Sequence, residues 1–201
     1  MFCASATVDP PDLNSLSMRF LLLVALIVAT LFPACKDDGP EIRLRMPIRP
    51  IDFTFDAGLS TFDSHFYTLQ DIPTNFDSLA ARAGLSAATV GAIRPRTAEL
   101  LGVFNNVDYE FIREISVRLC SAEERDQLAA GEAIECRREI FWRNPVPEGV
   151  GSNLGLVPNE NDLQEILTAS VATYQVKLVS PLRYPTAQFV ESRLFMEFNV
   201  E

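Results

Sequence analysis

Alternation of apolar and polar residues dominates the chain beyond residue 41. Over 42–49 every second residue is apolar, and the same rhythm continues over 51–56 with its phase shifted by one position. A period of two is typical of a strand with one face in a core. Pro50 stands at the phase change, and a proline cannot donate to a strand ladder. The pattern therefore predicts a strand interrupted by a β-bulge or by a break at a sheet edge.

Two further alternating segments flank a short helix in the middle of the chain. Their apolar faces comprise Phe111, Ile115, Val117 and Leu119 in the first, and Ile134, Cys136, Ile140 and Trp142 in the second. Between them lies Ser121-Ala122-Glu123-Glu124, a capping box in which serine and glutamate satisfy each other's free backbone N–H groups. Gly131 is suited to end the helix. We expect strands over 110–119 and 134–143, joined by a helix.

The C-terminal third repeats this pattern. Asn161 is placed to cap a short helix, and the apolar face of that helix is formed by Leu163, Ile166 and Leu167. Alternation then predicts strands over 174–178 and 190–200. The second of these is long and regular, so we expect it well inside a sheet.

Less regular segments complete the domain. They predict a strand over 62–69, a short helix over 76–83 and a strand over 89–101. Residues 144–158 contain three prolines and three glycines, which predicts a loop. Evenly spaced strands with few short helices predict an all-β domain over 41–201, an antiparallel Ig-like β-sandwich of about seven strands with one or two short helices.

Residues 18–34 have the layout of a signal peptide. A positive start is followed by 13 apolar or near-apolar residues from Phe20 to Phe32, and Ala34 is the small residue before Cys35. A membrane-spanning helix needs about 20 apolar residues, whereas a signal peptide needs about 7–15. We therefore expect a signal helix ahead of the domain.

Residues 1–17 fit export poorly, because they hold two aspartates, two prolines and no positive charge. We expect them to be a non-native leader from an over-extended start, with translation beginning at Met18.

A cysteine at the cleavage position resembles bacterial lipoproteins. The resemblance implies acylation of Cys35, including palmitate, and several acyl chains anchor a protein stably. Lys36, Asp37 and Asp38 resemble the acidic tag that sends lipoproteins of the Bacteroidota to the outer face of the outer membrane. The body is similar in pattern to small surface-exposed β-sandwich lipoproteins of that group, whose roles are undefined. Residues 35–40 would then be an acidic tether, and the periplasmic face remains the alternative location.

Export also bears on the other cysteines. Cys120 and Cys136 form an even pair in an oxidising compartment, which favours one disulfide. A metal site is disfavoured, because the chain has a single histidine.

The net charge is −10, and a nucleic-acid partner would need a basic surface instead. No glycine-rich phosphate loop is present. No cofactor and no metal ion are expected.

Candidate catalytic residues are few. His65 follows Asp63 and Ser64, but neighbouring residues of a strand point to opposite faces, so a triad is disfavoured. Glu123, Glu124 and Asp126 could act as paired acids, but capping and the helix dipole explain them better. No catalytic residue is therefore assigned.

Candidate binding residues are equally sparse. Asp52, Thr54 and Asp56 resemble the alternating oxygens of a calcium loop, but the glutamate that should close the loop is missing, and Asp63 stands there. Trp142 with Phe141 could stack on a sugar, although its alternation favours the core. Arg137-Arg138 is only a local basic spot.

These observations favour a non-enzymatic, lipid-anchored outer-membrane accessory protein, acting as a subunit or scaffold for another envelope protein. The alternative is a surface binding module for an external glycan or protein ligand.

Overall fold

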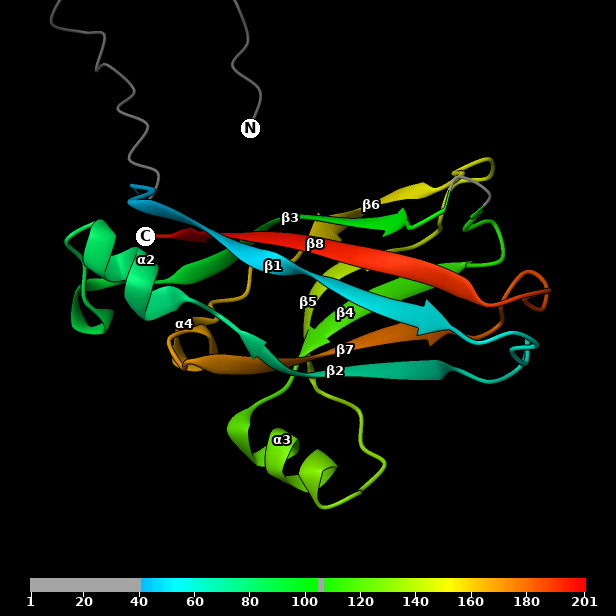
Figure 1. Ribbon diagram of the computed structural model, residues 1–201, viewed down its shortest axis with the longest axis horizontal. Helices are drawn as coiled ribbons and strands as arrows, with labels where there is room; N and C mark the ends of the chain where they lie inside the picture. Colours follow the sequence, from blue (N-terminus) through cyan, green and yellow to red (C-terminus); the bar gives the residue numbers. More distant parts are fainter. Residues whose placement is uncertain (1–40, 105–106) are drawn as a thin grey trace, which may run out of the picture. The chain divides into compact units, whose positions relative to one another are not determined.

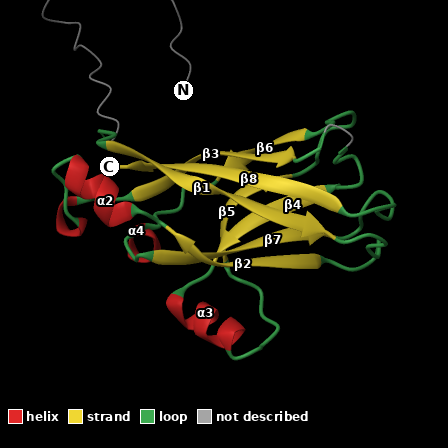
Figure 2. Ribbon diagram, viewed as in Figure 1, coloured by secondary structure: helices red, strands yellow, loops and turns green. Residues whose placement is uncertain are grey.

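The computed structural model describes residues 41–104 and 107–201, which form one unit built mainly of antiparallel strands (Figures 1 and 2). In chain order its elements are β1 (Leu44–Phe55), β2 (His65–Pro73), α2 (Phe76–Arg82), the 3₁₀ turn η1 (Ala87–Thr89), β3 (Ile93–Gly102), β4 (Glu114–Leu119), α3 (Ala122–Ala129), β5 (Arg138–Arg143), β6 (Asn153–Pro158), α4 (Gln164–Leu167), β7 (Val171–Val179) and β8 (Val190–Val200).

The strands follow the order β1-β8-β3-β6-β5-β4-β7-β2. The sheet folds over at the β6–β5 junction, so that two halves face each other. Phe141 of β5 packs on Phe198 of β8 across the interior, with ring centroids 5.8 Å apart. At the free edges Phe55 of β1 meets Tyr67 of β2 edge-on at 5.1 Å. The predicted all-β antiparallel sandwich is confirmed, with eight strands in the described residues instead of about seven.

Strand β1 lies at the edge of the sheet and contains the predicted bulge. Ile48 pairs with Met196 and Ile51 with Leu194, so three steps on β1 match two on β8. The bulge falls at Pro50, and the edge position tolerates the missing donor. Because the bulge shifts the alternation by one residue, the apolar side chains of both halves of the strand face the same core.

Strand β8 lies between β1 and β3, as the regularity of its sequence predicted. Alternate residues are buried: Val190, Ser192, Leu194, Met196, Phe198 and Val200. Two other predictions are confirmed with small shifts of their bounds, the helix before Gly84 and the strand β3. The strand expected over 62–69 begins later, at His65.

The predicted loop 144–158 contains strand β6. Leu154 and Leu156 are buried on either side of the exposed Gly155, and β6 pairs with β3. The surrounding glycines and prolines form the preceding turn. They are typical of a loop, so the short alternation of β6 was not predicted as a strand.

Strand β5 begins at Arg138, four residues later than predicted, and its face is reversed beyond Ile140. Val117 pairs with Phe141 and Arg118 with Glu139, which leaves Ile140 as an extra residue. This bulge buries both Ile140 and Phe141 and leaves Trp142 exposed. The prediction that Trp142 belongs to the core was therefore wrong.

Asn161 does not cap this helix: the N-cap of α4 is Leu163, without a side-chain capping bond, and Asp162 makes the nearby side-chain bonds. The Asp162 carboxylate accepts from the backbone N–H groups of Gln164 and Ile93, each at 3.0 Å. Asn161 instead donates to the Glu139 carbonyl at 2.9 Å. The helix starts at Gln164, one residue after its first predicted apolar position, Leu163.

Candidate functional site

A projecting segment between β4 and β5 is the most distinctive feature of the domain. Residues 121–137, hereafter the stapled arm, carry helix α3, which stands apart from the sheet in Figure 1. The disulfide Cys120–Cys136 closes its base, with Cα atoms 4.8 Å apart, and confirms the predicted pairing. Helix α3 has no buried residue, so its order depends on its ends.

The predicted capping box fixes the start of α3. The Ser121 hydroxyl accepts from the Glu124 N–H at 3.3 Å, and the Glu124 carboxylate accepts from the Ser121 N–H at 2.8 Å. Its second oxygen accepts from the Arg137 N–H at 3.0 Å. Glu124 thus joins both limbs of the arm, while Glu123 and Asp126 are exposed beside it. These bonds account for Glu124 as a structural group.

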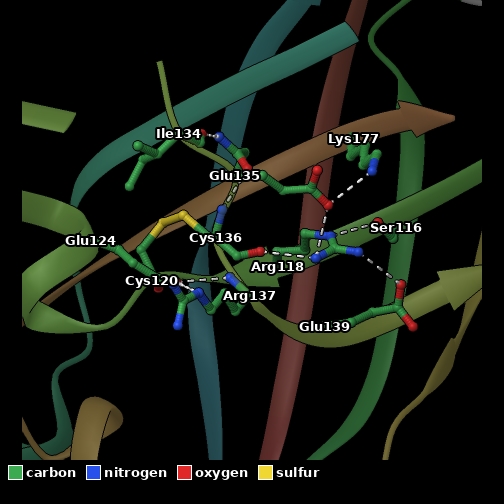
Figure 3. A network of polar contacts seen from close by, with 11 residues as sticks. Ser116, Arg118, Cys120, Glu124, Ile134, Glu135, Cys136, Arg137, Glu139 and Lys177 are labelled. Carbon is green, nitrogen blue, oxygen red and sulfur yellow. Dashed lines mark hydrogen bonds and ion pairs between the residues drawn. A yellow bond between two sulfur atoms is a disulfide. The ribbon is translucent and has the colours of Figure 1, made fainter. Parts of the chain in front are cut away.

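A half-buried ionic cluster lies under the return limb of the arm (Figure 3). Arg118, whose side chain is 18% exposed, pairs with Glu135 at 3.0 Å and with Glu139 at 3.8 Å. It also donates to the Cys136 carbonyl at 3.0 Å. Glu135 pairs in addition with Lys177 of β7 at 2.8 Å. The cluster fixes the limb to three strands at once.

The side chain of Gln175 in β7 bonds to the backbone of the return limb, as a neighbouring strand would. Its side-chain oxygen accepts from the Cys136 N–H, and its amide donates to the Ile134 carbonyl, each at 3.0 Å. Gln175 is only 1% exposed, so its two polar groups need these partners. The return limb of the stapled arm is therefore fixed to the sheet.

A row of four residues crosses the outer face of β5, β4, β7 and β2. Strand register places Trp142 opposite Ser116, Ser116 opposite Lys177, and Lys177 opposite Phe66. The outer two are exposed aromatics, and the Lys177 ammonium lies 5.3 Å from the Phe66 ring centroid. Three strand spacings separate the aromatics by about 14 Å. We call this set the aromatic row.

A second aromatic surface lies on the loops that follow β1 and β7. We call it the loop end; its exposed aromatics are Phe62 at 87%, Phe189 at 67% and Tyr184 at 46%. The loops bind one another, since the Leu182 N–H donates to the Thr61 carbonyl at 3.0 Å and the Gly58 N–H to the Thr186 carbonyl at 2.8 Å. The exposed aromatics are therefore carried by two loops that backbone hydrogen bonds join.

The loop end is also acidic. Partial burial and the carboxylates of Asp108 and Glu110 raise the pKa of Tyr184. Arg183 beside it is committed to structure, because its guanidinium donates to the Glu110 and Val146 carbonyls. A ligand at this end would meet aromatic rings among negative charges.

The three residues considered for a triad have separate structural roles or none. His65 donates from its ring to the Ser60 carbonyl at 2.8 Å. The Ser64 hydroxyl accepts from the Ser180 N–H at 3.2 Å, and Asp63 is exposed. These bonds hold the turn before β2, and no step of nucleophilic catalysis is assembled among them.

Of the three residues considered for calcium, Asp52 is engaged elsewhere. Asp52 binds the Arg193 guanidinium through both carboxylate oxygens, at 2.5 and 3.1 Å, and hydrogen bonding to Arg193 lowers the Asp52 pKa. Thr54 and Asp56 are exposed. Within residues 41–104 and 107–201, no group of three or more histidine, cysteine, aspartate or glutamate residues is placed to hold a metal ion.

The two neighbouring arginines, Arg137 and Arg138, lie in different environments. Arg137 is 94% exposed, with its guanidinium 3.9 Å from Glu124. Arg138 is half-buried and donates to the Asp162 carbonyl at 3.3 Å. Sequence reasoning did not anticipate this difference, because it arises from the turn at which the arm rejoins β5.

The residues predicted to direct export lie outside the described part of the chain. They are Cys35, Lys36, Asp37 and Asp38, with the signal peptide 18–34 and the leader 1–17. Among the described residues, no helix has the length and apolarity needed to cross a membrane.

Comparisons with known proteins identify no family. No family model matches the chain, and no curated protein matches it. A solved structure of Cocksfoot mottle virus is similar at 12% identity, covering 98% of this chain and 96% of that one, with a TM-score of 0.24.

Proposed function

We propose that this chain is a lipid-anchored outer-membrane protein, acylated at Cys35 and displayed at the cell surface, that serves as a non-enzymatic subunit or scaffold for another envelope protein. The signal layout of 18–34 and the acidic residues after Cys35 support the location. The loop end supports the role, because clustered exposed aromatics mark protein interaction sites.

The position of the loop end favours this use. The chain enters the domain at residue 41, and β1 then runs for 12 residues, from Leu44 to Phe55, a length of about 40 Å. The loop end begins directly after Phe55. It therefore lies at the far end of β1 from the residue at which the tether joins.

The test is a gentle detergent extraction of native membranes with an affinity tag after Glu201. We expect a membrane protein to co-purify in stoichiometric amount, and the double variant F62S/F189S to lose it. Phe66→Ser removes an exposed phenylalanine from the aromatic row and is the matched control, which should retain the partner. A solitary protein, or equal loss in both variants, would contradict the proposal.

A second function, binding of an external glycan, is favoured by the aromatic row. Exposed aromatic faces stack on apolar surfaces while neighbouring polar groups orient the ligand. In a glycan array, Trp142→Ala should abolish binding and F62S/F189S should leave it intact. Loss of binding only in the loop-end variant would instead assign recognition to the loops.

A further inference from the structure

A small cavity lies where the stapled arm leaves the sheet, between α3, α4 and β7. Its volume is about 240 Å³, and we call it the arm cavity. Drug-sized ligand pockets measure about 300–1,000 Å³, so this one would take a smaller molecule. It is separate from the loop end and from the aromatic row, and the inference does not depend on the function proposed above.

Two arginines contribute to the wall of the arm cavity. Arg125 comes from α3 and Arg138 from the start of β5, and both are half-buried. The chain has an excess of acidic residues. Nevertheless, within the described residues no carboxylate oxygen lies within 4.0 Å of either guanidinium. Guanidinium groups of this kind bind carboxylates and phosphates through paired hydrogen bonds.

Thr173 of β7 contributes to the wall of the arm cavity, but its hydroxyl group does not face a ligand there. The residue is 1% exposed, and its hydroxyl oxygen is buried without a partner among the residues that the structure describes. A ligand in the cavity would therefore meet the two arginines and not this hydroxyl.

The remaining wall decides what kind of anion fits. Ile166 and Val171 give it an aliphatic part, which favours a ligand with a short hydrocarbon body. Glu165 adds a negative charge to the same wall, which disfavours a doubly charged phosphate. We propose that the arm cavity binds a small organic monocarboxylate. Arg125 would pair with its oxygens together with Arg138, which uses the guanidinium N–H groups that do not donate to the Asp162 carbonyl.

The experiment uses the full chain purified in detergent, titrated calorimetrically with acetate, butyrate and hexanoate, and separately with inorganic phosphate, at constant ionic strength. We expect saturable binding of the carboxylates, tightest for butyrate or hexanoate. Arg125→Gln and Arg138→Gln should each weaken it about tenfold. Arg137→Gln makes the same change of charge on the neighbouring exposed side chain and should leave binding unchanged.

Thr173→Val is a second control. Valine has the shape of threonine but lacks the unpaired hydroxyl, so the Tm without ligand should stay the same or rise, and butyrate binding should be unchanged. Absence of saturable binding, preference for phosphate, or equal loss in Arg137→Gln would overturn the proposal.

Discussion

Tyr109 and Tyr174 are both fully buried, but their hydroxyl groups differ in their surroundings. The Tyr109 hydroxyl donates to the Ser192 hydroxyl at 2.9 Å. The Tyr174 hydroxyl has no partner among the described residues. The same side chain in two such settings allows a matched comparison of what a buried hydroxyl contributes.

Tyr109→Phe should lower the free energy of unfolding by about 1 kcal/mol, because it removes a buried hydrogen bond and leaves Ser192 with one partner fewer. Tyr174→Phe removes an unpaired hydroxyl and should be neutral or stabilising. Urea unfolding of both variants measures the difference. Equal destabilisation would mean that Tyr174 is also hydrogen-bonded in solution.

Alkaline pH should destabilise the domain through the same two residues. Burial raises the pKa of Tyr109 to about 12, although the bond to Ser192 acts in the opposite direction, and burial also raises the pKa of Tyr174. An unfolded tyrosine loses its proton near about pH 10, so above that pH the unfolded chain binds fewer protons than the folded one. Stability is therefore complete below pH 10 and falls as the pH rises toward 12.

Urea midpoints at pH 8, 10 and 11 measure this fall. The double variant Y109F/Y174F should show a smaller decrease between pH 10 and 11 than the parent protein does. An equal decrease in both proteins would assign the alkaline sensitivity to other groups.

Individual contacts were predictable from the sequence only where they are local. Ser121 and Glu124 are three residues apart, and their capping bonds follow from the motif. Gln175 lies 41 residues from Ile134 and Arg118 lies 18 from Cys136, and no short pattern encodes such pairs. The cysteine pairing was predictable because the domain over 41–201 holds only two cysteines, which allow one arrangement.

The stapled arm depends on its disulfide more than the sheet does. Its eight-residue helix has no buried face, and isolated helices of that length are marginal in water. Closing a loop of about 15 residues contributes roughly 3 kcal/mol in the chain-entropy model. The arm should therefore respond first when the link is removed.

The variant C120S/C136S tests this dependence. We expect proteolytic cleavage within residues 121–135 to become rapid, while the strands keep their protection against hydrogen exchange. Ser121→Ala removes the cap but retains the disulfide, and should loosen only the first turn of α3. Uniform loss of protection across all strands would show that the disulfide holds the whole sandwich.

Strands were predictable from alternation wherever the alternation was long, as in β8 and β1. It failed at β5, where the extra residue Ile140 reverses the phase, because a bulge on one strand is defined by its partner strand and leaves no sign in its own sequence. Alternation also failed to predict β6. Gly155 and the neighbouring prolines are typical of a loop, and the strand has only two buried leucines. The β-bulge at Pro50 was predictable because proline itself marks the break in the alternation.

Anchoring concerns the protein as a unit and rests on the proposed acylation. Cys35→Ser should move the protein from the membrane fraction to the soluble fraction, while the disulfide and the urea midpoint stay unchanged. Immunoblotting of separated fractions, with mass spectrometry of the N-terminal peptide, measures this. A variant that remains in the membrane fraction would refute a lipid anchor at Cys35.

The pairing of β1 with β8 has a consequence for the order of events during synthesis. The first strand of the sandwich cannot be paired until the last 11 residues of strand, Val190 to Val200, have been made. A chain still emerging from the ribosome or the export channel therefore presents an uncompleted sheet half, and long-range pairing of this kind is slow. Chains truncated before Val190 should remain sensitive to protease. Addition of a separate peptide with the sequence of residues 190–200 should restore their resistance. If the chain is exported as proposed, its sheet stays incomplete, and so easier to pass through a channel as a linear chain, until the last strand has been made.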